Sequence, residues 1–254
     1  MSRSVTCYPQ PGKERSRLVL EAFAAGCGGS IAAMSLPALR IGAAAFYGLV
    51  GLEHFFVVAR AARRDWYYGD NSFFDRGRGR YFRFARNAFQ ISALARPDHG
   101  RLRALGISPQ PWRTDGRHIV VVEQSEHFLR LAGVGPGWLK QVTGELARLT
   151  DRPLRIRGWR RDKDKASATL QADLAGAWAL VTHMSAAANE ALLAGVPVIC
   201  TGPCAASPLA RGALADIERP LCGDGREGWA AGLAAMQWTL DELRAGMAWK
   251  ALHE

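Results

Sequence analysis

Short apolar runs of strand length alternate with longer amphipathic stretches along most of the chain. Each run has three to six residues, and the polar or glycine-rich positions that bound it are typical of strand ends. The pattern predicts strands at 4–8, 43–47, 66–68, 117–122, 153–157, 177–182 and 198–200. Helical spacing of apolar residues predicts helices at 13–25, about 52–64, 138–149, 169–177, directly after Ser185, and within 226–244.

This strand–helix alternation predicts an α/β fold with largely parallel sheets. With 254 residues and 48% hydrophobic residues, the chain is long enough for one large domain or two small ones. Prolines and glycines gather near residues 96–114, which favours a division there. We therefore expect a small first domain at 1–105, a linker at 106–116, a second domain at 117–235 and a C-terminal helix at 236–254.

The stretch from His183 to Val198 carries the most information. The apolar run 177–182 precedes it, helix-forming residues follow Ser185, and Gly195 and Pro197 end the helix before the next strand. A helix that begins directly after a buried strand presents unpaired N–H groups at the carboxyl edge of the sheet, where anionic groups bind. If Ser185 opens the helix, Ala186, Asn189 and Glu190 share one face. The alternative is an ordinary connecting helix whose glutamate is solvated.

The residues Ser185, Glu190-Ala191-Leu192, Gly195 and Pro197-Val198 resemble the donor-binding segment of GT-B glycosyltransferases, a group that includes capsule-type and bacteriophage enzymes. The likeness covers about 20 residues closely and the C-terminal half loosely. It implies two Rossmann-like domains that face a cleft, with the acceptor on the first domain and a nucleotide-sugar donor on the second. It also implies that the helix start holds the donor diphosphate and that the glutamate holds the ribose.

The resemblance gives a set of candidate donor-binding residues. Loops at the carboxyl ends of the predicted strands supply most of them, and the basic loop after 153–157 supplies cations for diphosphate neutralisation. The set is Ser125, Arg157, Arg160, Lys163, His183, Ser185, Ala186 and Glu190. Asp162 and Asp164 form an Asp-x-Asp pattern, but the flanking lysines argue against a metal site. We therefore expect neither a metal nor a cofactor, only a nucleotide-sugar co-substrate such as a UDP-sugar.

Asp70 is the candidate catalytic base. The β-prone run 66–68 leads to Gly69-Asp70-Asn71, which is expected to break the strand where its carboxyl end meets the cleft. A carboxylate there can take a proton from an acceptor hydroxyl. The segment is similar to a Tyr-x-Asp-Asn-x-Phe segment of phage-borne GT-B-like proteins. The alternative is a structural Asx turn at Asp70 or Asn71. His127 is a second candidate acid or base.

The net charge of +10 is concentrated in two zones. Thirteen arginines and only five acidic residues lie between Arg60 and Arg117, and seven bases against three acids lie between Asp151 and Lys165. Within the first zone, arginines alternate with glycines and aromatic residues, a pattern that favours contact with a phosphate backbone and stacking on bases. The candidate acceptor or nucleic-acid residues are Arg76, Arg78, Arg80, Tyr81 and Arg83. A solvated basic loop with buried aromatics is the alternative.

Composition argues against several other classes of protein. No run reaches the roughly 18 uninterrupted apolar residues of a membrane helix, and the N-terminus lacks the apolar core of a signal peptide, so we expect a cytoplasmic protein. Five cysteines without Cys-x-x-Cys spacing indicate neither a disulfide framework nor a zinc site. The sequence does not predict the oligomeric state.

The leading hypothesis is a metal-independent, inverting glycosyltransferase that uses a nucleotide-sugar donor. The basic zone around residues 76–86 favours duplex DNA with hydroxymethylated bases as the acceptor, as in bacteriophage DNA modification. Two alternatives stay open. The acceptor can be a capsule or envelope glycan, or the protein can be a nucleic-acid or nucleotide-binding module without catalysis.

Overall fold

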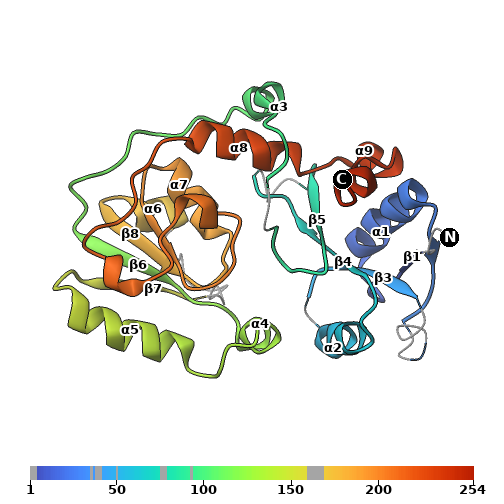
Figure 1. Ribbon diagram of the computed structural model, residues 1–254, viewed down its shortest axis with the longest axis horizontal. Helices are drawn as coiled ribbons and strands as arrows, with labels where there is room; N and C mark the ends of the chain where they lie inside the picture. Colours follow the sequence, from blue (N-terminus) through green and yellow to red (C-terminus); the bar gives the residue numbers. More distant parts are fainter. Residues whose placement is uncertain are drawn as a thin grey trace. The chain divides into compact units, whose positions relative to one another are not determined.

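The computed structural model describes residues 5–34, 37, 42–49, 51–74, 79–91, 94–158 and 169–254. The chain forms two compact units. The first comprises Met1–Arg101 together with Ala231–Glu254, and the second comprises Leu102–Ala230. Each unit contains one mainly parallel sheet with helices packed against it (Figure 1). The predicted α/β class with two Rossmann-like units is therefore confirmed.

The sheet of the first unit has five strands in the order β2-β1-β3-β4-β5. All neighbours pair in parallel except β4 and β5, which are antiparallel. The strands are β1 (Val5–Cys7), β2 (Ser30–Ile31), β3 (Ala43–Tyr47), β4 (Trp66–Asn71) and β5 (Phe82–Arg86). The helices that belong wholly to this unit are α1 (Glu14–Cys27), α2 (Glu53–Ala61), α9 (Leu240–Arg244) and α10 (Met247–Ala251).

Alternation along β4 explains how this sheet is covered on both faces. Successive side chains of a strand point to opposite faces. Trp66 and Tyr68 pack against Phe56 of α2, with ring centroids 5.4 and 5.8 Å away, whereas Tyr67 packs against Phe23 of α1 at 5.7 Å. Since both faces carry large aromatic rings, both faces need a helix.

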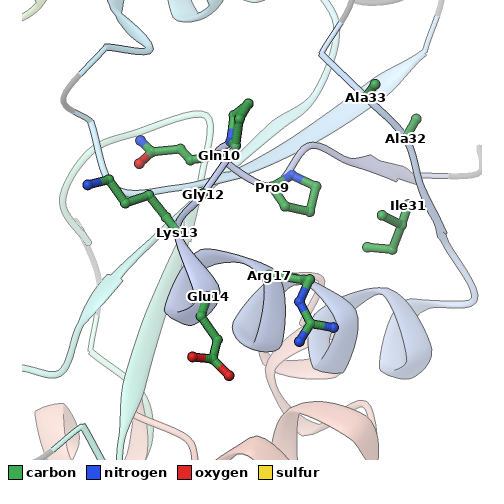
Figure 2. A pocket seen from close by; sticks show the side chains of 10 residues that line it. Pro9, Gln10, Gly12, Lys13, Glu14, Arg17, Ile31, Ala32 and Ala33 are labelled. Atoms are coloured by element: carbon green, nitrogen blue, oxygen red, sulfur yellow. The ribbon is translucent and has the colours of Figure 1, made fainter.

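The loop between β1 and α1 lines a pocket at the carboxyl end of β1 (Figure 2). In the sheet order of this unit, the chain connects β1 to β2 on one side, while β3 lies on its other side. The position between β1 and β3 is therefore the topological switch point of the sheet, where ligands of open α/β folds bind. The residues that line the pocket come from the carboxyl ends of β1 and β2, so the pocket adjoins this point on the β2 side.

The C-terminal segment completes the first unit. Phe82 and Trp238 exchange two backbone hydrogen bonds of 2.8 and 2.7 Å, so the segment covers the outer edge of β5. Helix α9 packs closely on α1, because a Cβ at Gly26 would lie 1.9 Å from the carbonyl oxygen of Leu243. The expected single C-terminal helix at 236–254 is thus two short helices, which belong with the N-terminal stretch rather than standing apart.

The second unit has a four-stranded parallel sheet in the order β7-β6-β8-β9. Its strands are β6 (His118–Val122), β7 (Leu154–Arg157), β8 (Ala177–Thr182) and β9 (Val198–Cys200). Its helices are α4 (Glu126–Leu131), α5 (Trp138–Leu149), α6 (Leu170–Leu174), α7 (Ala187–Leu193) and the 3-10 turns η2 (Ser207–Leu209) and η3 (Leu214–Asp216). Helices α3 (His99–Ala104) and α8 (Arg226–Ala235) contain the boundaries between the units.

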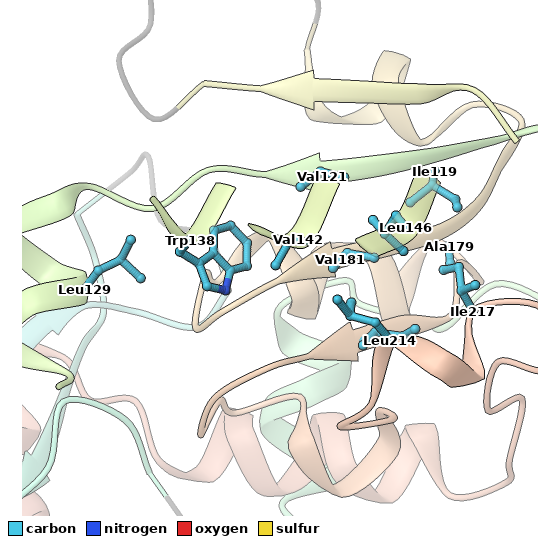
Figure 3. Close-up of a cluster of buried hydrophobic side chains, with 11 residues drawn as sticks. Ile119, Val121, Leu129, Trp138, Val142, Leu146, Ala179, Val181, Leu214 and Ile217 are labelled. Atoms are coloured by element: carbon cyan, nitrogen blue, oxygen red, sulfur yellow. The ribbon is translucent and has the colours of Figure 1, made fainter. Parts of the chain in front are cut away.

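The core of the second unit lies between its sheet and helix α5 (Figure 3). Helical spacing predicts Trp138, Val142, Leu146 and Leu149 on the inner stripe of α5; the first three are buried, whereas Leu149, at the end of the helix, is 37% exposed. They pack on strand residues such as Val121 and Val181. The segment expected as a linker, 106–116, also belongs to this unit, since Gln110 donates a backbone hydrogen bond to Leu193 at 2.8 Å.

We expect Gly26→Ala to destabilise the first unit. The added methyl would collide with the backbone of α9, and overpacking of this kind costs about 1–3 kcal/mol. Gly144→Ala is the matched control, because Gly144 also lies within a helix but a Cβ there meets nothing within 4 Å. That change should stabilise by about 0.5–1 kcal/mol through helix propensity. Urea unfolding of both variants measures the difference, and equal effects would contradict the proposed contact.

Candidate functional site

The carboxyl ends of β6 and β8 lie side by side in the second unit. Val122 pairs with Thr182 at the ends of these parallel strands, and β6 and β8 flank the switch point of this sheet. Two of the predicted donor-binding loops therefore start from the same edge. Ser125 caps α4, because its hydroxyl accepts a hydrogen bond of 3.3 Å from the Phe128 backbone N–H. The β8-to-α7 loop follows Thr182 at the same edge.

The prediction placed Ser185 at the start of helix α7, but Ser185 lies one residue before the N-cap of that helix. The residue that caps α7 is Ala186, and the Ser185 hydroxyl accepts from the Ala187 N–H at 3.2 Å. Thr182 also fixes the loop, since its hydroxyl accepts a hydrogen bond of 3.3 Å from the Ser185 backbone N–H. Ser185 and Ala186 are both partly exposed. The loop is thus fixed by its own hydrogen bonds, while its outer surface remains accessible.

His183 is held in one orientation by its neighbours. Its Nδ1 lies 3.0 Å from the Thr201 hydroxyl, which also accepts a hydrogen bond of 3.0 Å from the Trp138 indole N–H. The ring packs directly on Gly202, where a Cβ would lie 2.3 Å from the imidazole. Burial of the ring lowers the pKa of His183 below its usual value near 6.5. The imidazole is therefore neutral at pH 7, with one N–H donor and one acceptor nitrogen.

The expected polar face of α7 is only partly formed. Glu190 is half-buried, and its carboxylate accepts a hydrogen bond of 3.1 Å from the Gln171 side-chain amide. Asn189 is instead turned into the interior, with 1% of its surface exposed. Among the residues that the structure describes, its side-chain amide has no hydrogen-bond partner. Glu190 and Ala186 therefore share an accessible surface that Asn189 does not reach.

Of the three basic residues predicted to contact the donor diphosphate, the structure describes one. Arg157 forms an ion pair with Asp173 of α6, and its side chain is largely buried. Its charge is thus balanced inside the second unit. Arg160 and Lys163 lie outside the described residues, as do Asp162 and Asp164.

In the first unit, the strand does not end where the sequence predicted. Gly69, Asp70 and Asn71 continue β4, because they pair with Phe84, Arg83 and Phe82 of β5. The expected break was therefore wrong, since an antiparallel neighbour supplies backbone partners that local turn propensity cannot foresee. Asp70 remains at the carboxyl end of β4, one residue before the end of the strand.

A hydrogen-bonded ion pair fixes the Asp70 carboxylate. One carboxylate oxygen accepts from the Arg83 guanidinium at 3.0 Å and from the Tyr68 hydroxyl at 3.1 Å, and the other accepts from the Asn71 backbone N–H at 2.8 Å. The Arg83 side chain is 6% exposed and that of Asp70 is 23% exposed. Asp70 is thus a partly accessible carboxylate that is oriented by a buried cation.

The same pair corrects the prediction for Arg83. Its guanidinium also donates to the Phe89 carbonyl at 3.1 Å and lies 5.6 Å from the centre of the Tyr68 ring, so it cannot reach a phosphate backbone. Of the other predicted acceptor residues, Arg80 is exposed and Tyr81 is partly exposed. Arg76 and Arg78 lie outside the described residues. His127, the second candidate acid or base, is exposed and lies 2.7 Å from Arg130.

The sequence pattern did not predict the pocket of the first unit. It has a volume of about 550 Å³ and is lined by residues 9–14, Arg17 and 31–33. The available signal was Gly12-Lys13 between a predicted strand and a predicted helix, a place where α/β folds bind anionic groups.

Two further findings concern metals and membranes. In the part of the chain that the structure describes, no cluster of three or more histidine, cysteine, aspartate or glutamate residues is arranged to hold a metal ion. Among the described helices, none has the length and apolarity needed to cross a membrane.

No family model and no curated protein matches the chain. Solved structures do match. The chain is similar to the β-Kdo 2,4 transferase of Thermosulfurimonas dismutans KpsC, with a TM-score of 0.52, 14% identity, and coverage of 91% of this chain and 90% of that one. It is also similar to the β-Kdo 2,7 transferase of the same KpsC, with a TM-score of 0.54, 13% identity, and coverage of 98% and 99%. The predicted resemblance to GT-B glycosyltransferases is therefore confirmed as a likeness of fold over nearly the whole chain.

We expect Arg83→Met to destabilise the protein by about 2 kcal/mol. The change removes one partner of an ion pair whose arginine is buried. Breaking a pair costs about 3–5 kcal/mol when both charges are buried, and the cost is smaller here because Asp70 is partly solvated. Arg86→Met is the matched control on the same strand. Its pair with Asp65 is more than a third exposed on the arginine side, so the loss should stay below about 1 kcal/mol. Denaturant unfolding compares the two, and equal losses would contradict the difference.

The depressed pKa of His183 gives a pH dependence with a definite sign. The unfolded chain binds this proton more readily than the folded protein, so the contribution of His183 is complete above pH 6.5 and declines as the pH falls below it. NMR titration of the imidazole should give a midpoint below 6.5. Replacing His183 with Gln should reduce the loss of stability between pH 6.5 and 5. A midpoint at or above 6.5 would show that burial does not depress the pKa of His183.

Proposed function

We propose that the protein is a glycosyltransferase that moves a sugar from a nucleotide-sugar donor to a hydroxyl group of a capsule- or envelope-type glycan. The observation that carries the proposal is the likeness of fold to two Kdo transferases over at least 90% of this chain and of each of those chains. The likeness spans both units of this chain, so it is not limited to one common domain. By the same likeness, Kdo is the first sugar to test.

The second unit is proposed to bind the donor. Its switch point gathers the loops with Ser125, His183 and Ser185, and Ala186 and Glu190 follow on α7. Neutral His183 can donate an N–H to a phosphate oxygen, and the Glu190 carboxylate can accept two hydrogen bonds from a ribose diol. Arg160 and Lys163 remain proposed diphosphate contacts, whereas Arg157 is already paired with Asp173 and would have to leave that carboxylate to take part. Backbone N–H groups and these cations would stabilise the departing nucleotide electrostatically.

Asp70 of the first unit is proposed as the base. An oriented, ionised carboxylate can accept the proton of an acceptor hydroxyl while that oxygen attacks the sugar. Arg83 and Tyr68 hold one of its oxygens, which reduces the reorganisation that the step needs. Direct attack of this kind inverts the configuration at the sugar carbon. The scheme requires no metal, and both features remain part of the proposal.

A glycan acceptor is favoured over duplex DNA. The DNA hypothesis depended on a row of arginines that can reach phosphates, and Arg83 is buried in an internal ion pair. No other observation on the described residues favours DNA modification or a phage origin. A glycan acceptor needs no such row.

The test is a panel of nucleotide-activated sugars that includes activated Kdo, with thermal shift and nucleotide release as readouts. We expect at least one donor to stabilise the protein and to be consumed only when a glycan acceptor is present. Glu190→Gln should weaken donor binding about tenfold, because a charge-assisted contact to the ribose is lost. Glu145→Gln, an exposed change on α5 of the same unit, should leave donor binding unaltered.

Asp70→Asn separates catalysis from binding. It should keep donor affinity and reduce transfer by about 10²–10⁴-fold, the usual contribution of a general base. Retained transfer in Asp70→Asn would remove Asp70 from the scheme. Donor binding without turnover in the unaltered protein, for any acceptor in the panel, would favour a nucleotide-binding module instead.

A further inference from the structure

The pocket of the first unit lies beside the carboxyl end of β1. Pro9, Gln10 and Pro11 come from the loop after β1, and Ile31 with the next two residues comes from the carboxyl end of β2. Its volume of about 550 Å³ is in the range of small-molecule sites, roughly 300–1,000 Å³. The pocket can therefore hold a ligand the size of one or two sugar residues.

One wall of the pocket is apolar and accessible. Ile31 is 44% exposed, which places it among the most exposed large hydrophobic side chains of the described residues. Pro9 and the alanines that follow Ile31 are also apolar lining residues. Figure 2 shows Pro9 and Ile31 facing each other across the pocket. Rigid apolar surfaces of this kind suit the C–H face of a sugar ring.

The charged side chains at the pocket are mainly cationic. Lys13, the N-cap residue of α1, and Arg17 of α1 line it. Glu14 lines it as well, and in Figure 2 its carboxylate and the Arg17 guanidinium extend in the same direction, away from Pro9 and Ile31, so cations outnumber the acid two to one there. Arg17 also contacts Glu21 at 3.0 Å, and these two side chains are 55% and 42% exposed. Exposed pairs of this type contribute little energy, so Arg17 can exchange Glu21 for an anionic ligand.

The first turn of α1 connects the pocket to the proposed base. Arg15 follows the pocket residues Lys13 and Glu14, and its guanidinium lies 3.5 Å from the Asn71 side-chain oxygen. Asn71 is the neighbour of Asp70 and donates its backbone N–H to the Asp70 carboxylate. The pocket and Asp70 thus share one edge of one sheet.

We propose that this pocket binds an anionic sugar residue of the acceptor glycan, carrying a carboxylate or a phosphate, next to the hydroxyl that Asp70 activates. The apolar wall receives the sugar ring, and Lys13 and Arg17 bind the anionic group. The inference rests on the proposed function and names its acceptor class.

The test uses the full-length protein without any donor. Three disaccharides serve as probes, ending in glucuronic acid, in glucose 6-phosphate and in glucose. Amide chemical shifts in NMR titrations should change at Gly12, Lys13 and Ile31 with the two acidic probes. Their affinity should exceed that of the neutral probe about tenfold. The comparison of the two acidic probes tells which anion the pocket takes.

Two pairs of variants localise the binding. Arg17→Gln should weaken binding of the acidic probes about five- to tenfold. Arg244→Gln is the matched control and should leave their binding unchanged, because Arg244 is a similarly exposed arginine that is also paired with an acid on a helix of the same unit. Ile31→Glu should abolish binding by placing a negative charge on the wall. Val57→Glu, at a side chain that is 54% exposed on α2, should have no effect.

The outcomes separate this inference from the proposed function. Donor binding with no shifts at the pocket, or equal affinity for all three probes, overturns the pocket inference and leaves the transferase proposal standing. Shifts at the pocket with loss of affinity in Arg17→Gln support the inference even if every nucleotide sugar fails to bind, a result that would refute the transferase proposal alone.

Discussion

The parallel pairing of β6 with β8 is the constraint on which the candidate donor site depends. Parallel strands end at the same edge of a sheet, so the loops after Val122 and Thr182 must emerge together. The pairing is stable because both strands are almost entirely buried: both contribute to the α5 core, and α6 and α7 pack against β8.

Polar groups near the carboxyl edges are mostly satisfied before any ligand arrives. Thr201 links His183 to Trp138, and Arg83 links Asp70 to the Phe89 carbonyl. Buried charges and amides are costly when unpaired, so these networks stabilise the fold while they orient the groups that remain accessible. A site that is built this way is rigid, which favours chemistry that depends on positioning.

The first unit is assembled from both ends of the chain. Backbone hydrogen bonds between Phe82 and Trp238, and the close approach of α9 to Gly26, join the C-terminal segment to the N-terminal sheet. This covers an edge strand that would otherwise expose unpaired backbone groups. It also supplies apolar surface to a stretch of chain that is short for an independent Rossmann-like domain.

Local pattern alone determined the α/β class, most strands and helices, and the β8–α7–β9 segment, because burial on both faces leaves continuous apolar runs that can be read without neighbours. Tertiary structure decided the rest. Gly69–Asn71 reads as a break, yet it is strand because β5 pairs with it. Arg83 reads as a surface cation, yet it is buried because Asp70 lies opposite in register. Both depend on partners more than ten residues away, which the composition of a short window does not encode.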